Sequence, residues 1–443
     1  MPTPGKQTPK TNKSRRRFIV GAATGGAIAA GAFGVPLFVK RIAALSKRHK
    51  TSANGKIAVG VIGAGVRGNL LIQQLPESAQ LVTVCDCNSY RANYWKKDYP
   101  DIDTTQDYRE VLDRKDVDAV IVATAEFQRI LPCIHALQAG KDIYAEKPLS
   151  LYIREGRALV KAVKRYNRIL QVGTQQRSMA TNRVACEMIR SGKLGKVIEA
   201  QAVNYSGPMP MHPTSYNEKL PSFFDWNTWL NQAAGRDFGW EWPDGWRLWR
   251  DFSGGEMTDW GAHGLDQIQW ALGTDGTGPV EMKPLSPGLN GQVAMRYANG
   301  VPLNFILPEG HGTSGGGIFI CEKGKLEIGR NRVASNPSWI VEEIRKHVNT
   351  EDEERRWDDP KAQWQARWHL QDWLDCIRSR KQPVATAEIG HRSVTICHLA
   401  NIVRELGRPL KWDPTQEQFT DDAEANKYLE RPRRKGFELP TVD

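Results

Sequence analysis

The chain has few cysteines, and they follow no pattern that could organise a fold or a metal centre. Seven cysteines occur among 443 residues, and none shows the paired spacing of a zinc site. Cys85 and Cys87 stand too close together for an ordinary disulfide framework. We therefore predict reduced, mostly buried thiols and no metal site.

Acidic residues are absent from the first fifty positions. These positions hold eleven of the 61 lysines and arginines, so the remaining 50 basic residues balance the 50 acidic ones. The formal charge of +11 therefore belongs to the N-terminal segment. Because the rest of the chain carries no net charge, nothing in its composition indicates nucleic-acid binding, and we predict no nucleic-acid partner.

The N-terminal segment has the features of an export signal. Arg15, Arg16 and Arg17 precede an apolar stretch at residues 18–39 that is rich in glycine and alanine. Twin arginines before such a run indicate a twin-arginine signal, while the length of the run also suits a transmembrane anchor. We predict that residues 1–50 are a signal and basic linker read by the twin-arginine export machinery. The protein is then periplasmic, or membrane-anchored if the signal stays uncleaved.

A glycine-rich loop follows the first apolar strand pattern after this segment. The loop reads G-A-G-V-R-G, a helical pattern follows it, and an acid stands about twenty residues further on. This is the context that a dinucleotide-binding loop requires, because glycines let the backbone approach a pyrophosphate at a helix N-terminus. The acid favours NAD through hydrogen bonds to the ribose hydroxyls, and Arg91 nearby leaves NADP open. The predicted cofactor residues of this region are Gly63, Gly65, Val66, Arg67, Gly68 and Asp86.

Strand and helix patterns then alternate to about residue 174. This alternation predicts a doubly wound parallel Rossmann sheet over residues 54–174. Ligands in such sheets bind beyond the carboxyl ends of the strands, where Thr124, Glu146 and Lys147 stand. We predict that these three residues also contact the cofactor, although a lysine before a proline is equally typical of a surface turn.

The stretch at residues 254–270, G-G-E-M-T-D-W-G-A-H-G-L-D-Q-I-Q-W, predicts a helix after a Gly-Gly turn. On one helix, Asp259, His263 and Asp266 would share a face. A carboxylate beside an imidazole suits a general base, but the same spacing also fits a solvated ion pair, two metal ligands or a buried structural histidine. Local sequence does not decide among these readings.

The second half of the chain has a different pattern. Alternating runs and a tight turn at Asn299-Gly300 predict an α+β domain with a mostly antiparallel, open sheet over residues 175–412, followed by an arm at 413–443. Eight of the fifteen tryptophans lie within residues 226–270. Most of these rings suit core packing. The predicted substrate residues are Gln176, Arg177, Trp246 and Arg247.

Four motifs together resemble the glucose–fructose oxidoreductase and inositol dehydrogenase family, Gfo/Idh/MocA. They are the glycine loop, A-G-K-D-I-Y-A-E-K-P-L at 139–149, V-G-T-Q-Q-R-S at 172–178 and G-G-E-M-T-D-W-G-A-H at 254–263. E-I-G-H-R-S at 388–393 and K-W-D-P at 411–414 resemble exported bacterial members in particular. The resemblance implies NAD(P)-dependent oxidation of a secondary hydroxyl of a sugar. It also implies a homo-oligomer, dimer or tetramer, built on the open sheet face.

The resemblance also implies roles for three catalytic residues. Lys147 contacts the reacting hydroxyl and positions the nicotinamide, whereas Asp259 and His263 bind the hydroxyl and remove its proton. One loop departs from the family: where relatives often read T-P-D-H-W-H, this chain reads T-A-E-F-Q-R at 124–129. Contacts from that loop beyond Thr124 therefore cannot be transferred.

Export has a consequence for the chemistry. Free NAD(H) is not expected outside the cytoplasm, so we expect the cofactor to be bound before export and recycled within the site. Recycling permits either paired oxidation and reduction of two substrates or a redox-neutral glycosidase, lyase or epimerase reaction. A non-catalytic sugar-binding protein is the third reading.

Overall fold

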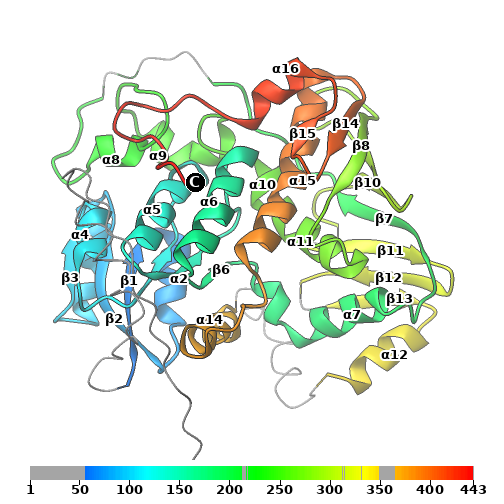
Figure 1. Cartoon of the computed structure of the whole chain (residues 1–443), viewed down its shortest axis with the longest axis horizontal. Coiled ribbons are helices and arrows are strands. Elements are labelled where there is room, and N and C mark those ends of the chain that lie inside the picture. The colour runs from blue at the N-terminus through cyan, green and yellow to red at the C-terminus, as the bar shows by residue number, and fades with distance from the viewer. Residues whose placement is uncertain are drawn as a thin grey trace, which may run out of the picture. The chain divides into compact units, whose positions relative to one another are not determined.

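The computed structural model describes residues 55–442, apart from 212–215, 217, 312, 314, 331 and 349–364. The predicted export signal lies outside the described residues. The described residues belong to one structural unit, which holds two sheets (Figure 1).

The first sheet is parallel and has the strand order β3-β2-β1-β4-β5-β6. Every residue of β1 and β4 is buried because helices lie on both faces, which explains the unbroken apolar runs in the sequence. The strand order reverses between β1 and β4, where ligands bind in such sheets. The predicted Rossmann sheet is confirmed. Its strands are β1 (Ile57–Ile62), β2 (Ala79–Cys85), β3 (Asp103–Thr105), β4 (Ala119–Val122), β5 (Asp142–Ala145) and β6 (Leu170–Val172), and its helices are α2 (Val66–Gln73), α3 (Ser89–Asn93), α4 (Tyr108–Asp113), α5 (Glu126–Gln138) and α6 (Ile153–Tyr166).

The second sheet has the order β13-β12-β11-β7-β10-β9-β8-β14-β15 and is antiparallel except for the β7–β10 pair. The predicted hairpin at Asn299-Gly300 joins β9 and β10, and Gly300 has the positive φ of 88° that this turn requires. The mostly antiparallel second sheet is therefore confirmed. Its strands are β7 (Val197–Val203), β8 (Pro279–Pro284), β9 (Val293–Tyr297), β10 (Pro302–Leu307), β11 (Gly317–Cys321), β12 (Gly324–Ile328), β13 (Val333–Asn336), β14 (Leu410–Asp413) and β15 (Gln418–Phe419).

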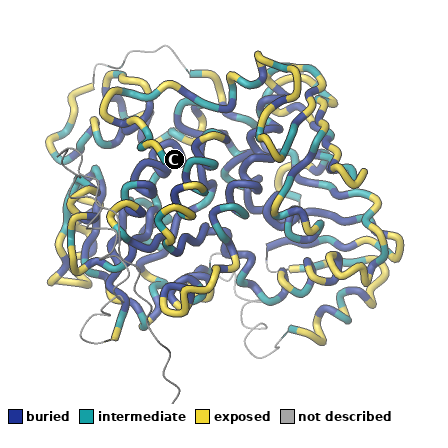
Figure 2. The backbone as a smooth tube through the Cα atoms, viewed as in Figure 1, coloured by how far each residue is buried: buried dark blue, intermediate teal, exposed yellow. Residues whose placement is uncertain are grey.

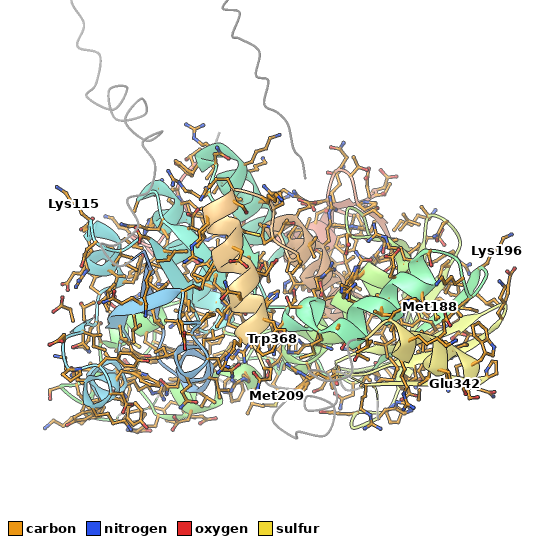
Figure 3. The ribbon with its side chains drawn as sticks, turned by 90° about the horizontal axis from the view of Figure 1, so that it is seen from below. Lys115, Met188, Lys196, Met209, Glu342 and Trp368 are labelled. Carbon is orange, nitrogen blue, oxygen red and sulfur yellow. The ribbon has the colours of Figure 1, made fainter. Side chains whose placement is uncertain are left out.

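The helices of the second half connect the two sheets. α7 and α11 pack on each other and, with α15, on the inner face of the second sheet. α14 packs on the first sheet instead, because Leu370 and Trp373 belong to the hydrophobic core of that sheet. The predicted domain boundary placed both residues in the second domain. Figure 3 shows α14, marked by Trp368, between Lys115 and Lys196 at the two ends of the unit. These helices are α7 (Ala180–Arg190), α8 (Trp226–Leu230), α9 (Glu241–Gly245), α10 (Glu256–Asp259), α11 (Gly261–Leu272), α12 (Trp339–Lys346), α14 (Arg367–Ser379), α15 (Ala387–Leu406) and α16 (Ala423–Asn426).

Two helices are buried on nearly all sides. In α5 only His135 and Gln138 escape burial, and most of α15 is buried as well (Figure 2). A helix on the face of a sheet normally keeps one polar side in water. Additional chain therefore covers the outer side of α5, and that chain comes from the tryptophan-rich region and the C-terminal tail.

The cysteines are free thiols, and all but the half-buried Cys87 are buried. Among the described residues, no group of three or more histidine, cysteine, aspartate or glutamate side chains is arranged to hold a metal ion. Within the same residues, no helix is both long enough and apolar enough to cross a membrane.

Candidate active site

The glycine loop lies against the end of β4. Gly63 has a φ of +93°, and a Cβ placed on it would lie 2.8 Å from the backbone nitrogen of Thr124. A Cβ on Gly65, by contrast, would meet nothing within 4 Å, and Val66 at the start of α2 is 80% exposed. The loop therefore presents open backbone at a helix N-terminus, which fits the pyrophosphate of a dinucleotide.

Asp86 directly follows β2 and joins the glycine loop to the next loop by hydrogen bonds. Its carboxylate accepts hydrogen bonds of 2.8 Å from the backbone nitrogens of Ala64 and Asn88. Burial raises the pKa of Asp86, and these bonds and the charge of Arg91 oppose the rise. Because an ionised carboxylate has about four acceptor positions, it can still accept from ribose hydroxyls.

The second side of the predicted cofactor site begins at the end of β5. Glu146 accepts a 2.7 Å hydrogen bond from Nε of Arg67, which joins the glycine loop to this strand. The next residue, Lys147, reaches into the second half of the chain: its Nζ lies 2.6 Å from Oδ1 of Asp259 and 3.1 Å from the carbonyl oxygen of the same residue. The structure thus brings the predicted lysine and aspartate into direct contact.

Asp259 also contacts Arg247, which in turn lies over the ring of Trp246. Nε of Arg247 lies 3.3 Å from Oδ2 of Asp259, and the Arg247 guanidinium lies 4.8 Å from the ring of Trp246. Burial alone raises the pKa of Asp259, but the charges of Lys147 and Arg247 outweigh it and hold the pKa below its ordinary value. Arg247 is 50% exposed, so a bound molecule can reach its guanidinium.

His263 lies in the first turn of α11 and is 4% exposed. Burial, followed by the charges of Arg330, Lys147 and Arg67, lowers the pKa of His263 well below its ordinary value. The imidazole is therefore neutral at neutral pH and can accept a proton. Among the described residues, its Nδ1 has no hydrogen-bond partner.

The single helix predicted through Asp259, His263 and Asp266 is wrong, because Asp259 ends α10 whereas His263 and Asp266 lie in α11. The helix is interrupted at Trp260, which separates α10 from α11. Asp266 forms a 2.8 Å ion pair with Arg177 and accepts a 2.8 Å hydrogen bond from the hydroxyl of Ser393. The buried Asp266 therefore links α11 to Arg177 and to Ser393 of α15, which is a structural role.

The structure also corrects the assignment of Arg177 as a substrate residue. Its buried guanidinium is paired with Asp266 and, at 2.7 Å, with Asp275, and it lies 5.1 Å from the ring of Trp270. These partners leave it inaccessible to a substrate. Its neighbour Gln176 lies closer to the site: a Cβ placed on Gly315 would lie 3.2 Å from Oε1 of Gln176 and 3.3 Å from Cβ of His263. Oε1 of Gln176 has no partner among the described residues.

Comparison with known proteins identifies the family. Residues 57–174 match the Gfo/Idh/MocA model described as an oxidoreductase family with an NAD-binding Rossmann fold. Residues 203–329 and 340–439 match the model of the oxidoreductase family's C-terminal alpha/beta domain. The chain belongs to the Gfo/Idh/MocA oxidoreductase family. The predicted resemblance is confirmed, and the fit of the glycine loop and Asp86 agrees with the NAD-binding description.

Individual Gfo/Idh/MocA relatives match over part of their length. Inositol 2-dehydrogenase 3 from Saccharopolyspora erythraea is 30% identical over 168 residues, which is 37% of this chain and 48% of the relative. The 2,7-anhydro-N-acetylneuraminate hydratase from Mediterraneibacter gnavus is 28% identical over 149 residues, which is 34% of this chain and 38% of the relative. Each match thus spans less than half of the curated relative. The solved WlbA dehydrogenase from Chromobacterium violaceum, in complex with NADH and UDP-GlcNAcA, covers 82% of this chain and 97% of its own, with a TM-score of 0.59 and 18% identity, which supports the fold.

The loop that departs from the Gfo/Idh/MocA pattern contains two buried charges that sequence reasoning missed. Oε1 of Glu126 accepts from the backbone nitrogen of Gly254 at 2.5 Å and from the hydroxyl of Thr258 at 3.2 Å. Burial raises the pKa of Glu126 to about 7. Arg129 donates to the backbone oxygens of Thr124 and Pro148. The signal in the sequence is the pair of charged residues in the first turn of a helix that continues with apolar residues.

Proposed function

We propose that the protein is an NAD-dependent oxidoreductase that acts on a secondary hydroxyl of a sugar or sugar derivative. The observation that carries this proposal is the 2.6 Å contact between Lys147, which follows β5 of the nucleotide-binding sheet, and Asp259, four residues before the buried His263. Bound NAD would supply the hydride acceptor. His263 would accept the hydroxyl proton, and Lys147 would stabilise the negative charge that develops on oxygen.

The charges around the site give His263, Lys147 and Asp259 different roles. The cations that lower the pKa of His263 also favour an alkoxide in the same space, because both effects arise from positive charge near buried groups. Asp259 holds Lys147 in place through the 2.6 Å contact and keeps further lone pairs for a substrate hydroxyl. The residues that would hold the cofactor are the glycine loop, Asp86, Thr124 and Glu146.

A carbohydrate substrate follows from the residues next to Asp259. The Trp246 ring is half-buried and can cover an apolar sugar face, while the Arg247 guanidinium donates hydrogen bonds to hydroxyl or carboxylate oxygens. Gfo/Idh/MocA relatives support this class, since one matched protein is an inositol 2-dehydrogenase.

We also propose that the cofactor is retained and recycled, because the N-terminal segment predicts export to the periplasm. One matched relative is named as a hydratase and not as a dehydrogenase, which supports the redox-neutral alternative: an NAD-dependent lyase, glycosidase or epimerase. Export by the twin-arginine machinery and assembly as a dimer or tetramer belong to the same proposal.

The test is to release and identify the nicotinamide of the purified protein and to follow its redox state while sugars and glycosides are added. We expect a change in the reduced-nicotinamide signal with a net oxidoreductase, and product without a net change with the redox-neutral enzyme. His263→Gln should remove either response, whereas substitution of an exposed histidine directly after α12, His347→Gln, should not. A parent protein that binds nicotinamide but changes neither it nor any sugar would contradict the proposal and indicate a non-catalytic binding protein.

A further inference from the structure

A segment from the second half of the chain packs on the nucleotide-binding half. This aromatic segment, residues 223–252, contributes most of a separate hydrophobic cluster that also contains Phe127 of α5. The ring centroid of Phe127 lies 5.3 Å from that of Trp229 and 4.8 Å from that of Phe252. Gln128 of α5 donates to the backbone oxygen of Trp229. The segment is therefore bound to the loop and helix that follow β4.

The same segment is also hydrogen-bonded to the loop that follows β2. The backbone nitrogen of Ser89 donates to the carbonyl of Phe223 at 2.9 Å, and the nitrogen of Asp225 donates to the carbonyl of Cys87 at 2.8 Å. Nε2 of Gln106, which follows β3, donates to the carbonyl of Cys87 at 2.6 Å and to that of Phe223 at 3.1 Å. These contacts begin one residue after Asp86, at the adenosine end of the predicted cofactor site.

Two aromatic rings meet at this junction. The ring centroids of Tyr90 and Phe223 are 4.5 Å apart with an interplanar angle of 44°. Tyr90 is nevertheless 68% exposed, so a large part of its ring is free to contact a bound molecule. Aromatic side chains of this kind bind nucleobases by stacking.

The C-terminal tail holds the aromatic segment from outside. Arg434 donates to the side chain and backbone oxygens of Asn227 at 3.0 and 2.8 Å, and to the backbone oxygen of Asn231 at 2.9 Å. Arg431 anchors the tail through a buried ion pair of 2.7 Å with Glu155 of α6. In Figure 1 the tail runs from α16 across the ends of α5 and α6 towards α8 and α9. The segment is thus fastened on both sides.

We propose that the aromatic segment, strapped by the C-terminal tail, forms a wall over the adenosine end of the NAD site and keeps the cofactor bound between turnovers. This inference rests on the proposed function, because it explains how an exported enzyme keeps its NAD. Tyr90 and Phe223 would contact the adenine, next to Asp86 on the ribose. The cofactor exchanges only after the segment has separated from residues 87–89. Exchange is slow because this separation breaks the two backbone hydrogen bonds and the two hydrogen bonds of the Gln106 side chain.

The test measures cofactor release and does not depend on a known substrate. Protein loaded with NADH is mixed with excess NAD, and the loss of reduced-nicotinamide fluorescence gives the release rate. Phe223→Ala should release NADH about tenfold faster, as expected when one aromatic contact with a base is lost. Arg434→Gln should also speed release although it touches no residue of the cofactor site. Lys435→Gln, the exposed neighbour of Arg434 on the tail, should release NADH at the parent rate.

The outcomes separate this inference from the proposed function. If the parent retains NADH and both Phe223→Ala and Arg434→Gln release it at the parent rate, the wall is disproved while the proposed enzyme stands. If the parent protein neither carries nor binds nicotinamide, the proposed function itself fails. Thermal unfolding of each variant shows whether it is folded, and Phe223→Leu, which keeps the apolar contact but removes the ring, replaces Phe223→Ala if that variant does not fold.

Discussion

Glu126 allows a direct test of the electrostatics around the candidate site. Its side chain is 1% exposed, Oε2 has no partner among the described residues, and burial raises its pKa from 4.5 to about 7. In the unfolded chain the group ionises near 4.5. Between these values the folded state binds more protons than the unfolded state, so stability falls as the pH rises. The shift corresponds to about 3 kcal/mol, since one pKa unit is about 1.4 kcal/mol.

Glu126→Gln removes the titration while its Oε1 can still accept from Gly254 and Thr258. The free energy of unfolding of the variant, minus that of the parent, should therefore increase by about 3 kcal/mol from below pH 4.5 to above pH 7. Urea unfolding at a series of pH values measures this difference. Glu241→Gln, an exposed glutamate in α9, serves as the control. A difference for Glu126→Gln that stays constant across the range would refute the reasoning.

Three further predictions concern stability and cofactor binding. Arg177→Met leaves Asp266 buried without its cation and should lower the free energy of unfolding by about 3 to 5 kcal/mol in urea; a loss of less than about 1 kcal/mol would contradict the assigned role. Burial lowers the pKa of His398 from 6.5 to about 4, so the neutral ring contributes fully to folding stability above pH 6.5 and this contribution is lost as the pH falls towards 4. His398→Gln should therefore reduce the loss of stability between pH 6.5 and pH 4 by about 3 kcal/mol. An unchanged dependence of stability on pH would count against this assignment. Gly65→Ala should weaken NAD binding in fluorescence titration without changing the melting temperature, because its Cβ would meet no protein atom within 4 Å. Gly68→Ala should lower the melting temperature, because its Cβ would lie 2.0 Å from a backbone oxygen. Equal melting temperatures of the two variants would be inconsistent with this packing.

Local patterns predicted those parts of the protein that local forces determine. The glycine loop between β1 and α2, the acid at the end of β2 and the β9–β10 turn each depend on residues close together in the chain. Lys147 and Asp259 were predicted separately from their motifs. Their 2.6 Å contact could not be predicted from spacing, because it joins positions 112 residues apart.

Contacts between distant parts of the chain determine the positions and roles that the sequence did not predict. Arg177 follows a strand end, as a cleft residue does, but Asp266 and Asp275 from the second half pair with it. α14 follows the strands of the second sheet in sequence, yet its apolar side packs on the first sheet. Glu126 stands in the loop that departs from the family pattern, and its role depends on the Gly-Gly turn, 128 residues further along the chain.

The central claim is that a sugar carbon gives its hydride to NAD held in the protein while His263 takes the hydroxyl proton. The most direct measurement uses the sugar to which the purified protein responds, deuterated at its reacting carbon, in a single turnover without added cofactor. Our account predicts that deuterium appears on the bound nicotinamide of the parent and is absent from that of His263→Gln. A redox-neutral reaction returns the deuterium to the sugar but still breaks the bond to it. Product formation by the parent with no deuterium on the nicotinamide and no slowing by deuterium, or transfer in His263→Gln at the parent rate, would therefore contradict it.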